Sequence, residues 1–140
     1  MCTSVDDAHS HRPAVPARIL VVDDEPPVRA SIARALGIHG YSVTCAESGE
    51  QALRIVDEEA LEFDLVVSDI VMGGMSGVAL AEQLVARGKP LRVILISGYP
   101  GSHFVERPEF QGRFDLLEKP FTPGELVARV AQSIQVGSAR

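Results

Sequence analysis

The hydrophobic residues of the chain form short runs that alternate with amphipathic segments along the sequence. Three runs are continuous and rich in β-branched residues, at 18–25, 63–69 and 91–98. Such runs are typical of strands that are covered on both faces of a parallel sheet. Two further runs, at 41–46 and 114–118, are more polar or alternate in polarity, which is typical of strands at sheet edges. The pattern therefore predicts five strands, three of them central.

Segments with helical periodicity lie between these strands. The first repeats apolar residues every four positions before Gly37, and the second opens with the Ser-x-x-Gln capping box that begins at Ser48. The third is followed by a stop at Gly88 and Pro90. The last, at 122–136, combines a capping box, a proline at the first helical position and one apolar stripe. These signals predict four well-formed helices.

The segment 99–113 has a weaker helical pattern. Its two prolines and two glycines leave room for about two turns of helix, so we expect a short or irregular fourth helix there. Strands and helices that alternate in this way predict an α/β fold with a doubly wound, five-stranded parallel sheet. The strand order 2-1-3-4-5 is that of flavodoxin-like folds. We place this domain at 17–136, between a disordered N-terminal tail, 1–16, and a C-terminal tail, 137–140.

Composition narrows the class of protein. At 140 residues, with 46% hydrophobic and 23% charged residues, the chain suits one soluble globular domain. The net charge of -6 argues against direct binding to nucleic acid, because no block of Lys and Arg is present to replace counterions. No apolar run approaches the roughly 18 residues that span a membrane, and the N-terminus lacks the order of a signal peptide. We expect neither nucleic-acid binding nor membrane insertion.

The cysteines and histidines suggest no separate site. Cys2 and Cys45 form no disulfide framework and lack metal-ligand spacing, which favours a reducing compartment, the cytoplasm. His9 and His11 lie in the N-terminal tail and are interpreted as solvated residues.

Polar residues end four of the predicted strands. In open α/β sheets, sites form at the carboxyl ends of the strands, where the strand order reverses between the first and third strands. Those two strands end in Asp23, Asp24 and Asp69, the fourth ends in Ser97, and the fifth leads into Lys119. Singly, these residues could be ordinary caps and surface groups. Because they share one edge of the sheet, we expect them to form a site.

Three adjacent carboxylates require either a positive charge beside them or a proton on one of them. Two unit charges about 4 Å apart repel by about 4 kcal/mol at an effective dielectric constant of 20. Oxygen ligands without His or Cys favour Mg²⁺, and Mn²⁺ accepts the same ligands. Lys119 adds a second cation. A metal ion and an ammonium group beside one carboxylate suit phosphoryl transfer to that carboxylate, with Asp69 as the nucleophile.

Four motifs at these strand ends resemble those of a known family. They are VVDDE at 21–25, SDIVMGGMSG at 68–77, LISG at 95–98 and EKPF at 118–121. In order and spacing they resemble the receiver domain of two-component response regulators, over roughly residues 17–136. Each motif alone is weak, but the four together at these spacings are specific.

The resemblance implies a role for each residue of the site. Asp69 resembles the aspartate that accepts a phosphoryl group from a kinase phosphohistidine. Asp24 resembles a direct Mg²⁺ ligand, Asp23 a ligand that acts largely through water, and the backbone carbonyl of Val71 the last protein ligand. Ser97 resembles the switch hydroxyl that turns to bind the phosphoryl group.

The end of the fifth strand also resembles the family, but the chain departs from the family at three other places. Lys119 resembles the lysine that contacts the phosphoryl group, and the peptide bond before Pro120 is expected to be cis. Family members commonly have proline at the position of Gly73, so we expect a more flexible loop there. Leu116 occupies the position of a switch aromatic residue. The irregular segment 99–113 resembles receivers attached to hybrid sensor kinases.

The expected function is that of a phosphoacceptor receiver, either a single-domain regulator or a receiver like those of hybrid kinases. The partners would be a sensor histidine kinase or a histidine phosphotransfer protein, and the chain would catalyse only its own phosphorylation and dephosphorylation. Signalling would follow conformational switching or onward phosphorelay, and a phosphorylation-dependent homodimer is left open. The main alternative is a pseudo-receiver, a binding module that works without phosphorylation.

Two other classes fit less well. A flavodoxin-like cofactor binder needs a phosphate-binding Gly/Ser/Thr loop after the first strand, whereas this chain has carboxylates and prolines there. An aspartate-nucleophile phosphatase normally has a second acid two residues after the nucleophile, where this chain has Val71.

Overall fold

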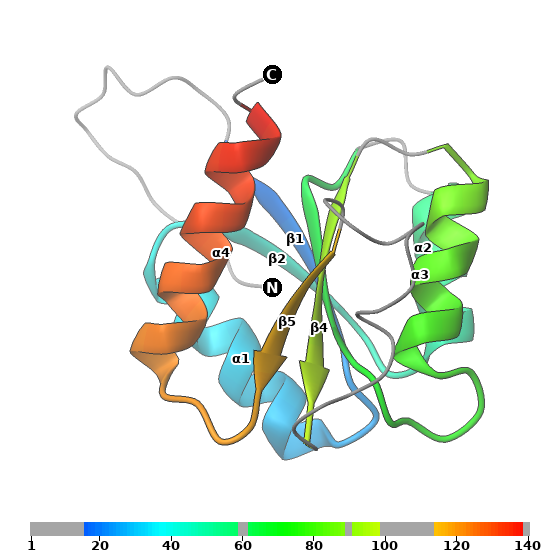
Figure 1. Cartoon of the computed structure of the whole chain (residues 1–140), viewed down its shortest axis with the longest axis horizontal. Helices are drawn as coiled ribbons and strands as arrows, with labels where there is room; N and C mark the ends of the chain where they lie inside the picture. The colour runs from blue at the N-terminus through cyan, green and yellow to red at the C-terminus, as the bar shows by residue number, and fades with distance from the viewer. Residues whose placement is uncertain (1–15, 59–61, 89–90, 99–113, 139–140) are drawn as a thin grey trace.

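The computed structural model describes residues 16–58, 62–88, 91–98 and 114–138. Within these residues, strands and helices alternate over most of the chain, as Figure 1 shows. The elements are β1 (Arg18–Val22), α1 (Pro26–Ile38), β2 (Ser42–Ala46), α2 (Gly49–Glu58), β3 (Leu65–Asp69), α3 (Gly77–Ala86), β4 (Arg92–Ser97), β5 (Phe114–Glu118) and α4 (Pro123–Ser138).

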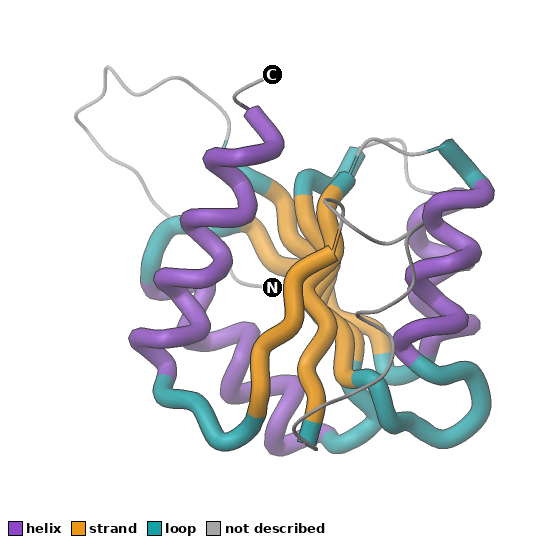
Figure 2. Tube along the Cα trace, viewed as in Figure 1, coloured by secondary structure: helices purple, strands orange, loops and turns teal. Residues whose placement is uncertain are grey.

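The five strands form one parallel sheet in the order β2-β1-β3-β4-β5. Helices α1 and α4 cover one face, and α2 and α3 cover the other, so that the sheet is the middle of three layers (Figures 1 and 2). The predicted doubly wound sheet and its strand order are confirmed. All carboxyl ends of the strands consequently lie at one edge of the sheet.

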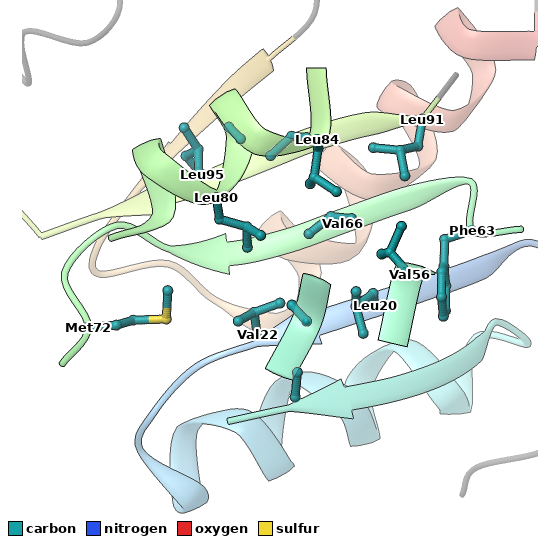
Figure 3. Packing of buried hydrophobic residues seen from close by; sticks show 14 residues of the cluster. Leu20, Val22, Val56, Phe63, Val66, Met72, Leu80, Leu84, Leu91 and Leu95 are labelled. Carbon is teal, nitrogen blue, oxygen red and sulfur yellow. The ribbon is translucent and has the colours of Figure 1, made fainter. Parts of the chain in front are cut away.

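Side chains of the central strands alternate between two hydrophobic clusters. Leu20 and Val22 of β1 face α2 and α3, where they pack in the cluster that Figure 3 shows, with Leu80 and Leu84 of α3. The cluster on the opposite face contains the strand residues Ile19, Val21, Val67 and Ile96, together with residues of α1 and α4. The central strands are therefore buried on both faces, as their continuous apolar runs predicted.

The predicted capping residues of α4 and α2 form hydrogen bonds at the starts of these helices. At α4, Glu125 N–H donates to Thr122 Oγ1 at 3.0 Å, and Thr122 N–H donates to Glu125 Oε1 at 2.9 Å, which is a complete capping box. At α2, Gln51 N–H donates to Ser48 Oγ, but the Gln51 side chain accepts from the N–H of Glu47, one residue earlier than a regular box.

Helix α1 extends beyond its periodic apolar residues, the last of which is Leu36. The helix continues through Gly37 to Ile38, and His39 caps it. The left-handed turn lies at Gly40, with φ of 92°. The chain therefore reverses three residues after Gly37, at a position where positive φ favours glycine.

Two of the sequence predictions concern residues outside the described ranges. The N-terminal tail, apart from residue 16, and the short or irregular fourth helix at 99–113 lie there. At the other end, α4 continues to Ser138 and so includes the first two residues of the predicted C-terminal tail. Among the described residues, none of the helices has the length and apolar character needed to cross a membrane.

Candidate functional site at the carboxyl edge of the sheet

The structure brings the predicted site residues to one edge of the sheet. Asp23 and Asp24 follow β1, and Asp69 is the last residue of β3, the strand beside it. Ser97 ends β4, and Lys119 follows β5. The strand order reverses between the neighbouring strands β1 and β3, and sites in open α/β sheets form at the carboxyl ends of such strands.

The three acids form a compact cluster. One carboxylate oxygen each of Asp23, Asp24 and Asp69 lies within 4.8 Å of the others. Asp23 and Asp69 are buried, with 1% and 8% of their surface exposed, whereas Asp24 is exposed. Acidic side chains at such separations and burial repel one another unless a cation or a proton lies between them.

Asp23 has a carboxylate oxygen that lacks a protein donor. Its Oδ1 accepts a hydrogen bond from the N–H of Glu25 at 2.9 Å, but its Oδ2 is buried and has no hydrogen-bond partner among the described residues. Burial raises the pKa of Asp23, and the charge of Asp69 raises it further. A buried acceptor without a donor, beside two further carboxylates, fits a hard divalent cation such as Mg²⁺.

Asp69 has a positive neighbour. Lys119 Nζ lies 3.4 Å from Asp69 Oδ1. Burial raises the pKa of Asp69 above its usual value, and the nearby Lys119 ammonium partly offsets this rise. The N–H of Lys119 donates to the carbonyl of Ser97 at 2.8 Å, and the Lys119–Pro120 peptide bond is cis, as the resemblance implied. The end of β5 is thereby attached to the end of β4.

The loop after β3 contains further predicted residues. Val71 lies two residues beyond the end of β3, and the residue is 64% exposed. Met72 is buried in the α2 and α3 cluster, and Met75 packs against that cluster beside Gly49, so both methionines are packing residues. Ser76 then caps α3 by accepting from the N–H of Ala79 at 3.1 Å.

The two positions at β5 that bear on switching face the same side of the sheet. Phe114 and Leu116 both pack against the α2 and α3 cluster, whereas Leu117 belongs to the cluster on the other face. Phe114 and Leu116 share this face because side chains alternate between the two faces of a strand with a period of two.

Two residues that support the site were missed in the sequence. Arg29, in the first turns of α1, donates from Nη1 to the carbonyl of Asp23 at 2.7 Å and so fixes the peptide that joins the first two acids. Gly77 begins α3, and a Cβ there would collide with the carbonyl oxygen of Asp69. A positive residue one turn into the first helix was a usable signal for Arg29, whereas the contact of Gly77 depends on the path of the loop.

Comparison with known proteins assigns the family. The family model of the response regulator receiver domain matches residues 19–131, which is most of the chain. The sensor kinase CckA of Brucella abortus is 37% identical over 119 residues, which are 85% of this chain and 13% of that protein. The response regulator MprA of Mycolicibacterium vanbaalenii is 35% identical over 116 residues, which are 83% of this chain and 49% of that protein.

A solved structure agrees with these relatives. The response regulator TrrA of Thermotoga maritima, in complex with Mg²⁺-BeF, has a TM-score of 0.72 and 34% identity, over 83% of this chain and 97% of that one. The chain spans less than half the length of both curated relatives. The fold and the family model agree, and the chain belongs to the response regulator receiver domain family.

Proposed function

We propose that the protein accepts a phosphoryl group on Asp69 in a Mg²⁺-dependent reaction. The observation that carries the proposal is the buried carboxylate of Asp69, 3.4 Å from Lys119 and within 4.8 Å of two further acids. Phosphoryl transfer depends mainly on positioning and on neutralising oxygens, and these groups supply both. The Lys119 ammonium would balance charge that develops on the phosphoryl oxygens, and Asp69 would act as the nucleophile.

The ligands of the cation would be Asp23, Asp24, Asp69 and the backbone carbonyl of Val71. The orphaned Oδ2 of buried Asp23 supports this set, and so do the relatively hard carboxylate oxygens. When bound, Mg²⁺ neutralises the acids and the incoming phosphate oxygens, and Mn²⁺ would use the same ligands. Arg29 holds the peptide between Asp23 and Asp24, which keeps both side chains on the site.

Signalling would start at Ser97 and Lys119. A phosphorylated Asp69 carries about -1.5 to -2 charge in place of its single carboxylate charge, and it presents new acceptor oxygens towards which both residues would move. Lys119 directly follows β5, and β5 is hydrogen-bonded to α4. In that bond, Arg129 Nη1 of α4 donates to the carbonyl of Leu116 in β5 at 2.6 Å. Movement of Lys119 would therefore reach α4, and partners would bind the two populations differently.

The proposed donors are a sensor histidine kinase or a histidine phosphotransfer protein. Receiver modules occur in kinases such as CckA and in regulators such as MprA, according to the relatives of this chain. Catalysis would be limited to the module's own phosphorylation and dephosphorylation. Location in a reducing compartment, which is the cytoplasm, stays a prediction. Formation of a phosphorylation-dependent homodimer also stays a prediction.

The pseudo-receiver alternative has less support. A binding module without phosphorylation would have no use for a buried acceptor carboxylate, a lysine beside it and an acid cluster with an orphaned oxygen. All five polar residues are present and lie at one edge of the sheet. A site that had lost its chemistry would be expected to lack one or more of them.

The test is intact-mass analysis after incubation with acetyl phosphate, with and without Mg²⁺. Wild type should gain one phosphoryl adduct that requires the ion, and Asp69→Asn should gain none. Asp57→Asn is the matched control, because Asp57 belongs to an ion pair with Arg87 near the end of α2. If folded wild type stays unmodified by a donor that works on a control regulator, the pseudo-receiver interpretation replaces the proposal.

A further inference from the structure

Gly73 and Asp24 lie on different loops of the site and are joined by a hydrogen bond. The backbone N–H of Gly73 donates to Oδ2 of Asp24 at 3.0 Å, across 49 residues of sequence. Gly73 belongs to the loop between β3 and α3, and Asp24 to the loop between β1 and α1. The bond therefore connects the segment that follows Asp69 with one of the proposed metal ligands.

Asp24 depends on such a bond more than the other two acids do. Asp23 and Asp69 are buried, so neighbouring atoms restrict their side chains, whereas Asp24 is exposed. An exposed side chain exchanges between staggered rotamers on the picosecond to nanosecond timescale. Rotation would carry its oxygens away from the other acids, which lie within 4.8 Å in this orientation. A carboxylate has about four acceptor positions, so one N–H donor leaves room for an ion.

Neither backbone conformation nor space requires glycine at position 73. The φ of Gly73 lies outside the left-handed region, in contrast to Gly74, whose φ is 79°. A Cβ at position 73 would meet Asp24 Oδ2 at 3.8 Å, which is ordinary van der Waals contact. What position 73 contributes to the site is its N–H group, which every residue except proline provides.

We infer that the Gly73 N–H is a positioning group that holds Asp24 in the orientation in which it binds a divalent cation. The inference rests on the metal site of the proposed function and deepens it. From Gly73, we predict that the loop after β3 is flexible. The hydrogen bond from Gly73 to Asp24 connects this loop to the proposed metal site. Groups that orient metal ligands commonly change metal affinity by about 10- to 100-fold when they are removed.

The test compares Gly73→Pro, which lacks the N–H, with Gly73→Ala, which retains it. Mn²⁺ affinity is measured from the electron paramagnetic resonance signal of the free ion, because Mn²⁺ accepts the same oxygen ligands as Mg²⁺. Gly73→Pro should bind Mn²⁺ about 10-fold more weakly than wild type, the lower end of the range for such groups because the bond is exposed. Gly73→Ala should stay within about 2-fold of wild type, since its Cβ has room.

Two results would overturn the inference. One is equal Mn²⁺ affinity in the proline and alanine variants, since the loss of the donor would then have no effect of its own. The other is the absence of Mn²⁺ binding in wild type. Wild type that binds Mn²⁺ but gains no phosphoryl adduct from acetyl phosphate would instead refute the proposed function and leave the inference standing.

A second measurement avoids the risk that Gly73→Pro fails to fold. In metal-free protein, Asp24→Ala removes the acceptor and leaves position 73 unchanged. The amide proton of Gly73, followed by NMR, should exchange with solvent several-fold faster in Asp24→Ala than in wild type, because the hydrogen bond protects it. The Ala79 amide, which donates to Ser76, is the internal control and should keep its rate. Equal protection of Gly73 in both proteins would also refute the inference.

Discussion

Replacing Gly77 with alanine tests whether the start of α3 sets the position of Asp69. A Cβ at position 77 would collide with the carbonyl oxygen of Asp69 and lie 2.9 Å from Ile70 Cα and 3.0 Å from the Asp69 carbonyl carbon. All three are backbone atoms, so no side-chain rotation can relieve the contact. The end of β3 or the start of α3 must shift, and both support the proposed phosphoacceptor.

The expected magnitude follows from two opposing effects. Inserting a methyl group into a packed interior costs about 1–3 kcal/mol, and the rigid neighbours of Gly77 place this site at about 3 kcal/mol. Alanine in place of glycine in a helix stabilises by up to about 1 kcal/mol. We therefore expect Gly77→Ala to lower the free energy of unfolding by about 2 kcal/mol, together with slower phosphorylation.

Urea denaturation and the rate of adduct formation with acetyl phosphate measure both effects. Gly124→Ala is the matched control, because Gly124 lies in the first turn of α4 and the atom nearest its Cβ is Thr122 Oγ1 at 3.8 Å. The control should equal wild type or be slightly more stable. Gly77→Ala that unfolds at the same urea concentration as Gly124→Ala and is phosphorylated at the wild-type rate would refute the reasoning.

Three further predictions concern charge. Asp23 and Asp69 have pKa values above 3.8 in the folded protein. At pH values between 3.8 and those raised pKa values, the native state therefore binds more protons than the unfolded state. The metal-free protein should become more stable as pH falls through that window, which the midpoint of urea unfolding measures. Asp23→Asn should weaken this pH dependence. A wild-type urea midpoint that decreases as pH is lowered through the window would contradict the prediction. Lys119→Met removes the ammonium beside Asp69 and should raise the pKa of Asp69 further, as carboxyl NMR titration would record; an unchanged pKa argues against the contact. Arg87→Met breaks an exposed ion pair with Asp57 and should cost at most about 1 kcal/mol in urea unfolding, so a larger loss would mean that the pair is more than a surface contact.

The sequence was sufficient to predict the sheet and the place of the site. Continuous apolar runs marked the central strands, and the topology of a parallel sheet then brought the ends of β1, β3, β4 and β5 to one edge. Asp23, Asp69 and Lys119 could be placed together for that reason alone. The strand order and the residue at each strand end determine which side chains meet at that edge, and both could be predicted from one sequence.

The supporting contacts could not be predicted in the same way. The bond from Gly73 to Asp24 and the close approach of Gly77 to Asp69 depend on the path of the loop between β3 and α3. Several loop paths satisfy the same glycine-rich sequence, because glycine allows most backbone conformations. Gly37 and Gly40 show the same limit, since Gly37 lies within α1 whereas Gly40 has the positive φ of the turn that follows it. Local glycine signals indicate a range of conformations, and packing selects among them.

Locating the phosphoryl group on the chain tests the central claim most directly. Wild type is incubated with acetyl phosphate and Mg²⁺, treated with borohydride, which reduces an aspartyl phosphate to homoserine, and digested for peptide mass spectrometry. The account predicts homoserine at position 69, and an unmodified peptide when Mg²⁺ is omitted. Homoserine at Asp23, Asp24 or another acid, with Asp69 unmodified, would contradict the account.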